Sequence, residues 1–178
     1  MKKRRLMLCS IISLIMVFVM AVPMTVSADT ATKEAGDATA LTNAITGAQN
    51  GDTIKLTAPI TASITIPADK NITLDLNGQT LTNEAGKHTI TNEGTLTIKG
   101  DGTVDNVSHA RAAVYNKQGA TATLSGGKFT RSKETGKSDS VSGGNSYYNI
   151  LNQGEMTIND GVEVSQTGHF SSLIDNGW

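Results

Sequence analysis

Apolar and polar residues alternate along most of the chain after Gly51. Isoleucine or leucine takes every second position in short groups that end at proline, glycine or asparagine: Ile54 and Leu56; Ile64 and Ile66; Ile72, Leu74 and Leu76. A period of two turns one side of each segment toward a core, and the residues that end the groups are typical of turns. The pattern predicts an all-β fold built from strands of about three to five residues.

A helical period precedes these strands. In residues 37–50 the apolar positions recur three and four apart, at Leu41, Ala44, Ile45 and Ala48. Asp37 or Thr39 is suited to cap the first turn, and Gly51 stands where a left-handed residue ends many helices. We therefore expect a short helix over 37–50. Residues 29–36 are small and polar and predict a flexible segment.

A repeat follows the helix. Counted from Gly94 or from Gly154, an asparagine lies two residues before, and apolar residues lie two, four and ten residues after. Around Gly119 the first positions are shifted by one residue, which we interpret as a local β-bulge. Near Gly177, an aspartate takes the asparagine position. The repeated polar positions are Asn92, Asn116, Asn152 and Asp175, and the apolar ones include Leu96, Val104, Ala122, Leu124, Phe129, Met156 and Val164.

Such repeats must stack, because two or three short strands cannot bury an apolar face alone. Stacking in register at about 4.8 Å places the apolar positions of successive coils above one another. The longest interval between the repeat glycines contains a polar run rich in serine, lysine and glycine, and we assign residues 131–147 to an inserted loop. The period predicts a parallel β-helix solenoid.

Residues 51–82, GDTIKLTAPITASITIPADKNITLDLNGQTLT, behind a short helix, resemble the opening coils of right-handed parallel β-helix proteins of the pectin-lyase-like superfamily. The likeness is to large secreted or cell-surface proteins of Gram-positive, Clostridia-like bacteria. The resemblance implies one domain over 37–178, with a capping helix at 37–50 and coils from 51 to 178. It implies no activity, because the same scaffold hosts lyases, hydrolases, adhesins and passive stalks.

The N-terminus has the organisation of a secretory signal peptide. Four basic residues precede an apolar stretch from Leu6 to Val22, and Val26 and Ala28 stand at the −3 and −1 positions of a cleavage site before Asp29. Residues 1–28 are therefore expected to be removed, which predicts a secreted protein, free or attached to the cell surface. No later segment is apolar enough to span a membrane. Cys9 is the only cysteine, so no disulfide is expected.

The charge that remains argues against nucleic acid as a partner. Without the signal the chain has 11 basic and 16 acidic residues, a net charge of about −5, whereas nucleic-acid binders show a basic stripe. Threonine, asparagine and glycine are abundant, and only six aromatic residues remain, a composition that favours strands and turns.

The repeated amides have a structural interpretation. Asn92, Asn116, Asn152 and Asp175 occupy one position per coil, so their side chains can form a hydrogen-bonded ladder along the solenoid. The threonines beside the apolar positions, such as Thr95, Thr97 and Thr121, are expected to face outward. An ice-binding threonine array is the alternative, but Glu155 interrupts it; exposed strand faces favour threonine in any case.

The candidate catalytic and metal-binding residues do not form a convergent set. Asp101, Asp105, Asp160 and Glu163 can be compared with the calcium-binding acidic clusters of the superfamily, but two of them lie in turn sequences. Arg111 and Arg131 are the only arginines after the signal, and the Arg-x-Lys spacing at 131–133 lacks the paired aspartates that polygalacturonases need. His88, His109 and His169 form no pair and are expected to be solvated turn residues. We predict no catalytic residue, no bound metal and no cofactor; calcium is the one ion that the comparison with the superfamily leaves open, and nothing in this sequence supports it.

The aromatic residues offer a sugar site. Tyr147 and Tyr148 end the inserted loop, and Tyr115 can join them in a platform for a sugar ring; packing over the solenoid is the alternative. We expect the ligand to be a polysaccharide, on host or bacterial cell walls.

The sequence halts inside a coil at Trp178, so we expect a C-terminally truncated solenoid that is prone to edge-to-edge self-association. The leading hypothesis is a non-catalytic adhesin-like stalk or weak glycan-binding module. The alternatives are a fragment of a lyase or glycoside hydrolase that acts on acidic polysaccharide, and a purely structural piece of a larger surface protein.

Overall fold

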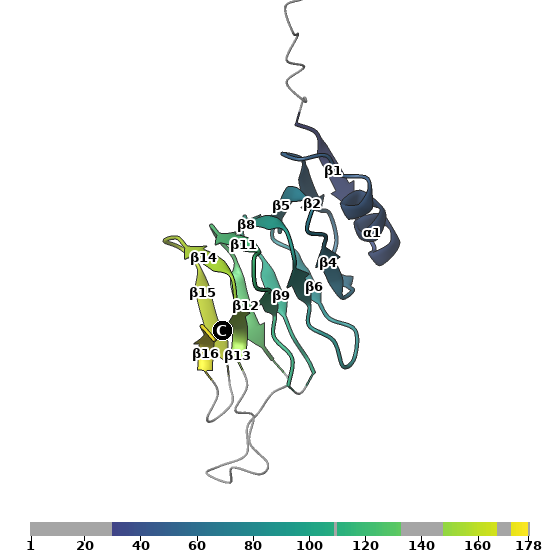
Figure 1. Ribbon diagram of the computed structural model, residues 1–178. Coiled ribbons are helices and arrows are strands. Elements are labelled where there is room, and N and C mark those ends of the chain that lie inside the picture. Colours follow the sequence, from purple (N-terminus) through teal and green to yellow (C-terminus); the bar gives the residue numbers. More distant parts are fainter. Residues whose placement is uncertain (1–29, 109, 133–147, 167–171, 178) are drawn as a thin grey trace, which may run out of the picture.

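The computed structural model describes residues 30–108, 110–132, 148–166 and 172–177. They form a parallel β-solenoid of about five turns, with one short helix after the first strand (Figure 1). Each turn contributes one strand to each of three all-parallel sheets. The predicted β-helix architecture is therefore confirmed. No helix in the described ranges is long and apolar enough to cross a membrane.

The three sheets take their strands in a fixed rotation along the chain. The first sheet contains β1 (Thr32–Ala35), β2 (Thr53–Leu56), β5 (Asn71–Asp75), β8 (Thr95–Lys99), β11 (Thr121–Leu124) and β14 (Glu155–Ile158). The second contains β3 (Ile60–Thr61), β6 (Thr80–Thr82), β9 (Thr103–Asp105), β12 (Lys128–Arg131) and β15 (Glu163–Gln166). The third contains β4 (Ile64–Ile66), β7 (Ile90–Asn92), β10 (Val114–Asn116), β13 (Tyr148–Asn152) and β16 (Ser172–Asp175).

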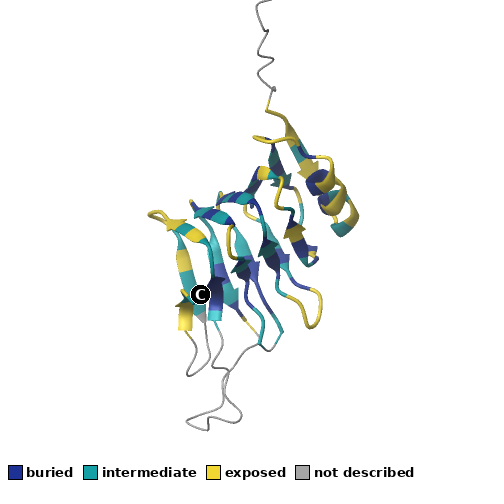
Figure 2. Ribbon diagram, in the orientation of Figure 1, coloured by how far each residue is buried: buried dark blue, intermediate teal, exposed yellow. Residues whose placement is uncertain are grey.

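The apolar ladders predicted from the repeat line the interior. Leu96 pairs with Ala122, which pairs with Met156, and the second sheet aligns Val104, Phe129 and Val164 in the same way. Leu96, Val104, Ala122 and Phe129 are fully buried. Figure 2 shows the inner positions of the central coils in dark blue and exposed positions on the last coil in yellow. Burial of these ladders supplies the main driving force for stacking.

The bulge expected around Gly119 is a longer turn. Two residues, Glu93 and Gly94, separate β7 from β8, and four residues, 117–120, separate β10 from β11. The strands on both sides keep their register, since Asn92 pairs with Asn116 and Leu96 with Ala122. The two extra residues therefore lie in the turn between the strands, and the pairing of the strands themselves is unchanged.

Residues 32–35, expected to be flexible, form strand β1 at the edge of the first sheet. Thr32 pairs with Thr53, and Ala35 is fully buried. The buried carboxylate of Asp52 accepts hydrogen bonds from the Lys33 ammonium at 2.7 Å and from the Ala31 N–H at 2.9 Å. These contacts cross about 20 positions of sequence, so the local composition of 29–36 contained no sign of them.

The helix α1 spans Ala38–Thr46 and is shorter than the 37–50 predicted. The Asp37 carboxylate caps it by accepting from the Ala40 N–H at 2.8 Å. It ends at Gly47, because Asp52 accepts a hydrogen bond from the Gln49 N–H and draws that segment into a turn before β2. Leu41 and Ile45 are buried against the first coil.

The inserted loop was placed one residue too early at its start. Arg131, its first predicted residue, is the last residue of β12 and is fully buried. Residues 133–147 lie outside the described part of the chain.

The threonines form one long column on the outside of the first sheet. Thr53, Thr73, Thr97, Thr123 and Thr157 are in register across five strands. The neighbouring column has Thr95 and Thr121 between Asn71 and Glu155. A two-column threonine lattice therefore extends over only two coils, which gives the ice-binding alternative little surface.

Candidate ligand-binding groove

The outer face of the third sheet carries polar and aromatic side chains in register. Thr65 pairs with Thr91, and Thr91 with Tyr115. Their neighbours Ile64, Ile90 and Val114 are buried, so strand alternation turns the first set outward. Tyr115 lines one hollow and contacts His88, which lines another; these two hollows and Tyr115 form the feature that we call the groove.

The first hollow, with a volume of about 570 Å³, lies where the strands of the third sheet begin. Its floor contains Thr65 and Thr91. Its rim comes from two loops, 83–89 and 106–112, which belong to neighbouring coils. The described lining residues are Ser63, Ile64, Thr65, Gly86, Lys87, His88, Thr91 and Arg111.

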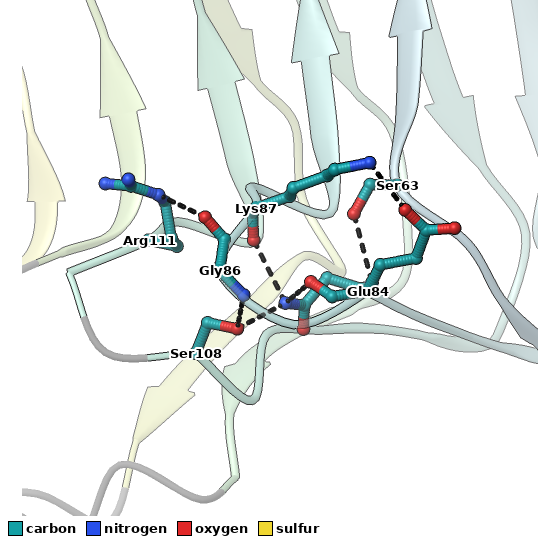
Figure 3. A network of polar contacts seen from close by, with 7 residues as sticks. Ser63, Glu84, Gly86, Lys87, Ser108 and Arg111 are labelled. Atoms are coloured by element: carbon teal, nitrogen blue, oxygen red, sulfur yellow. Dashed lines mark hydrogen bonds and ion pairs between the residues drawn. The ribbon is translucent and has the colours of Figure 1, made fainter.

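The rim loops are fixed by a buried amide. The Asn83 side-chain nitrogen donates to the Lys87 carbonyl at 3.0 Å and to the Ser108 hydroxyl at 2.8 Å, and its oxygen accepts from the Val107 N–H at 2.7 Å. The Ser108 hydroxyl also accepts from the Gly86 N–H at 2.8 Å (Figure 3). One buried side chain thus ties two adjacent coils together and holds the rim in shape.

Arg111 is held from the opposite loop. Its Nε donates to the Gly86 carbonyl at 2.7 Å (Figure 3). Its Nη1 donates to the Ala110 carbonyl at 2.9 Å. Lys87 forms an exposed ion pair with Glu84 at 2.7 Å. The position of the Arg111 guanidinium on the rim is therefore set by backbone carbonyls, and no carboxylate takes part in the two bonds.

His88 connects the first hollow to Tyr115. Its Nδ1 accepts from the Ala112 N–H at 2.9 Å, and its ring centroid lies 5.0 Å from that of Tyr115 at a tilt of 43°. Burial, and then the positive charge of Arg111, lower the pKa of His88 to about 4. The imidazole is therefore neutral at pH 7, and since Nδ1 is an acceptor, Nε2 carries the proton. His88 is half-buried and bonded, in contrast to the solvated turn residue expected.

The second hollow, about 450 Å³, lies on the other side of Tyr115, where the strands of the third sheet end. The Tyr115 hydroxyl donates to the Gln153 side-chain oxygen at 2.7 Å. Lys117 and Glu93 form an ion pair at 2.7 Å, and this bond raises the pKa of Lys117. Ala68 and Gln118 complete the described lining.

The predicted tyrosine platform is not assembled by the described residues. Tyr115 pairs with Leu151, and Tyr148 lies three residues before Leu151 in β13, so it has the opposite alternation. Tyr148 lines neither hollow, and Tyr147 lies outside the described residues. Of the two tyrosines that the structure describes, only Tyr115 lines the groove.

The asparagine ladder runs beneath the turns of the third sheet. The side-chain nitrogen of Asn92 donates to the side-chain oxygen of Asn116 at 2.8 Å, and Asn116 donates to Asn152 in the same way at 2.8 Å. Asn152 donates to Asn176 at 2.6 Å, whereas Asp175 pairs with Leu151 and stands one residue away. The fourth position was therefore wrongly assigned to Asp175. An amide both donates and accepts, so each member can bond to the coils on both sides; an ionised carboxylate only accepts.

The carboxylates considered for catalysis or calcium do not converge. Asp105 is buried and accepts from the Thr130 hydroxyl and from the N–H and hydroxyl of Ser132, which fixes the end of β12. Asp101 and Asp160 lie exposed in turns. In the described ranges, no three histidine, cysteine, aspartate or glutamate side chains are grouped to hold a metal ion. His109 and His169 fall outside those ranges.

Sequence reasoning missed the groove. It treated Arg111 as a remote catalytic candidate and did not consider Lys87, Thr65 or Thr91. The rim loops are 23 residues apart in sequence and share no motif, so only the stacking of their coils reveals the hollow. Comparison with protein-family models, curated proteins and solved structures finds no match to this chain, and the assignment of the fold rests on the strand pairing described above.

Proposed function

We propose that this chain is a non-catalytic carbohydrate-binding β-solenoid, and that the glycan lies across the groove on the outer face of the third sheet. The observation that carries the proposal is the position of Tyr115, a half-buried aromatic ring that lines the second hollow and contacts His88, which lines the first. Aromatic rings pack against the apolar face of a sugar, while polar side chains at their edges bond its hydroxyl groups.

The construction of the groove supports binding. Its floor is a β-sheet, and its rim loops are tied by Asn83 and by a second buried amide, Asn106, which donates to the Lys87 and Ala112 carbonyls at 3.0 and 2.9 Å. A site that is already ordered loses less entropy when a ligand binds. Rigid scaffolds that hold loops in this way are common supports for ligand sites.

The chemistry of the lining favours binding over hydrolysis. Among the described residues that line the two hollows, Glu93 alone is acidic, and it is ion-paired to Lys117. Glycoside hydrolysis generally uses two carboxylates on opposite sides of the scissile bond. The groove therefore supports a binding module better than the alternative of a lyase or hydrolase.

The proposed setting is extracellular. The export signal expected in residues 1–28 supports a secreted or surface protein, and residues 51–82 resemble the coils of secreted or cell-surface proteins, which agrees with that setting. We propose an adhesin-like module that presents the groove along the side of a stalk.

The proposal is tested by co-sedimentation of the full chain with insoluble cell-wall, mucin and plant polysaccharides. We expect depletion of the protein without release of sugar, and weakening of at least ~10-fold in Tyr115→Ala, the order of magnitude for loss of a central aromatic contact. Thr97→Ala, on the outer face of the first sheet, is the control and should bind as the wild type does. Failure of the wild type to bind any polysaccharide, or unchanged binding by Tyr115→Ala, contradicts the proposal, and released oligosaccharides would favour the enzyme.

A further inference from the structure

We infer that the first hollow binds the anionic group of an acidic sugar, a carboxylate or a sulfate ester, by direct hydrogen bonds from Arg111 and His88 and without a bridging metal ion. The inference rests on the proposed glycan binding and specifies the class of sugar that the groove selects.

Arg111 provides the charge and the geometry. Its guanidinium carries five N–H donors in one plane, and two of them are used on the Gly86 and Ala110 carbonyls. Those two bonds fix the plane of the group before a ligand arrives. A fixed guanidinium plane suits the paired oxygens of a carboxylate or a sulfate, to which arginine binds in a two-point arrangement.

His88 provides a second donor. Because Nδ1 is occupied by the Ala112 N–H, the protonated nitrogen is Nε2, and the neutral ring keeps this N–H at physiological pH. The ring lines the hollow on one side and contacts Tyr115 on the other. It can therefore bond a ligand atom in the first hollow while Tyr115 supports the adjacent sugar ring.

The charge balance of the hollow favours an anion. Its described lining contains Arg111 and Lys87 and no acidic residue, while Glu84 pairs with Lys87 from outside the lining. The chain without its signal has a net charge of about −5, so general attraction of anions by the protein is not expected. Preference for an anionic sugar must therefore come from this local arrangement.

The remaining lining suits the rest of a sugar residue. The hydroxyls of Ser63, Thr65 and Thr91 can donate to or accept from sugar hydroxyls, and the volume of about 570 Å³ is large enough for at least one sugar ring. Among the residues that the structure describes, no three histidine, cysteine, aspartate or glutamate side chains are grouped to hold a metal ion. The structure therefore gives no support to recognition of the sugar through a calcium ion. Direct donors are the alternative that the geometry offers.

The test measures binding of three matched oligosaccharides to the full chain by calorimetry. They share one backbone and are neutral, oxidised to the uronic acid, or sulfated. We expect one or both anionic forms to bind at least ~10-fold tighter than the neutral form at low salt, with no loss in EDTA. Comparison of the uronic acid with the sulfate ester identifies which anion is preferred.

Variants locate the effect. Arg111→Gln should weaken binding of the anionic forms more than binding of the neutral form, so that the preference is lost. Lys55→Gln removes the same charge from the first sheet and should keep the preference. Because Arg111 also supports the rim, Thr65→Glu is a second test that alters an exposed side chain and places a carboxylate in the hollow. It should lower anionic binding selectively. Thermal unfolding of each variant verifies its fold.

The outcomes separate the two proposals. If no oligosaccharide binds, glycan binding itself is wrong. If the neutral and anionic forms bind equally, or if both Arg111→Gln and Thr65→Glu keep the preference, the groove binds glycan but the anion site is wrong. Loss of the preference in EDTA would assign it to a metal ion and overturn direct recognition.

Discussion

Asparagine side chains occupy the buried positions of this solenoid at which a polar turn passes close to the apolar core. Asn116 is fully buried and accepts from Asn92; it donates to Asn152 and to the Glu155 carbonyl, the latter at 2.9 Å. Each such amide satisfies groups on its own coil and on the next. The ladder therefore links coils through bonds that an apolar residue of the same size cannot replace.

Replacement of Asn116 by leucine should be strongly destabilising. Leucine has the same branching and the same number of side-chain heavy atoms, but it leaves the Asn92 amide, the Asn152 oxygen and the Glu155 carbonyl with fewer partners in a buried position. We expect a loss of ~2–4 kcal/mol in the free energy of unfolding, measured by urea denaturation. Asn159→Ala, at an exposed turn, is the control and should change stability by less than ~0.5 kcal/mol. A loss equally small in Asn116→Leu would show that the ladder contributes little.

Asp52 makes the attachment of β1 sensitive to acid. The hydrogen bond from Lys33, followed by those from the Gln49 and Ala31 N–H groups, lowers the pKa of Asp52 from 3.8 to about 2. A folded-state pKa below the unfolded value gives stability that is present above pH 4 and is lost as the pH falls toward 2.

Asp52→Asn should therefore be less stable than the wild type at pH 7, and the difference should shrink as the pH falls from about 4 to about 2. The measurement is the thermal midpoint of both proteins over this range. Asp69→Asn removes the same charge from an exposed turn and serves as the control. A difference between wild type and Asp52→Asn that stays constant with pH would contradict the role assigned to the carboxylate.

At the scale of elements, two kinds of turn alternate along one edge of the solenoid. A four-residue turn follows β4 and β10, and a two-residue turn with glycine follows β7 and β13. The short turn fits beneath the long turn of the preceding coil. A Cβ on Gly94 would lie within 2.5 Å of the Lys70 carbonyl oxygen and closer still to that of Pro67, and Gly154 has the same relation to residues 117–120.

Gly94→Ala should consequently destabilise the fold by ~2–4 kcal/mol, because backbone on both sides would have to move. Gly119 is in a long turn with φ at +82° and no atom within 4 Å of an added Cβ. Asparagine tolerates this conformation, so Gly119→Asn should cost less than ~1 kcal/mol. Urea denaturation compares the two, and equal stability losses would contradict the distinction between the turns.

At the scale of the whole molecule, each coil contacts mainly its neighbours, so stability is expected to vary along the axis. Leu96 and Ile98 in β8 are fully buried, whereas Ile158 in β14 and Ile174 in β16 are each 41% exposed. Figure 2 shows the same gradient from the central coils to the last one. The groove lies over the better-buried coils, which suits a site that depends on a fixed rim.

Hydrogen exchange should follow this gradient. Amides of β8 and β11 are expected to exchange at least ~10-fold more slowly than those of β14 and β16, since fewer buried contacts oppose local opening of the last coil. Mass spectrometry of peptides from these strands makes the measurement on the full chain. Uniform protection along the solenoid would indicate a single cooperative unit and contradict the gradient.

From the sequence came the strand period, the N-terminal helix and the repeat that stacks apolar positions of successive coils. These follow from local spacing, because a period of two, a capping residue and a turn glycine act within a few residues. The same spacing identified three of the four ladder asparagines, and the suitability of aromatic side chains for sugar rings placed Tyr115 among the candidate site residues. The structure then chose Asp37 over Thr39 as the cap and Ala122 over Leu124 as the partner of Leu96.

The three-dimensional fold was needed to find the pairing of residues 32–35 with β2, the place of Asn176 in the ladder and the groove around Tyr115. Each depends on residues about 20 or more positions apart in sequence that meet because coils stack, such as Lys33 with Asp52 and Arg111 with Gly86. The period of the sequence shows that coils stack. It does not show which loops become neighbours, because turn length varies freely outside the strands while the strand register is held by the buried ladder.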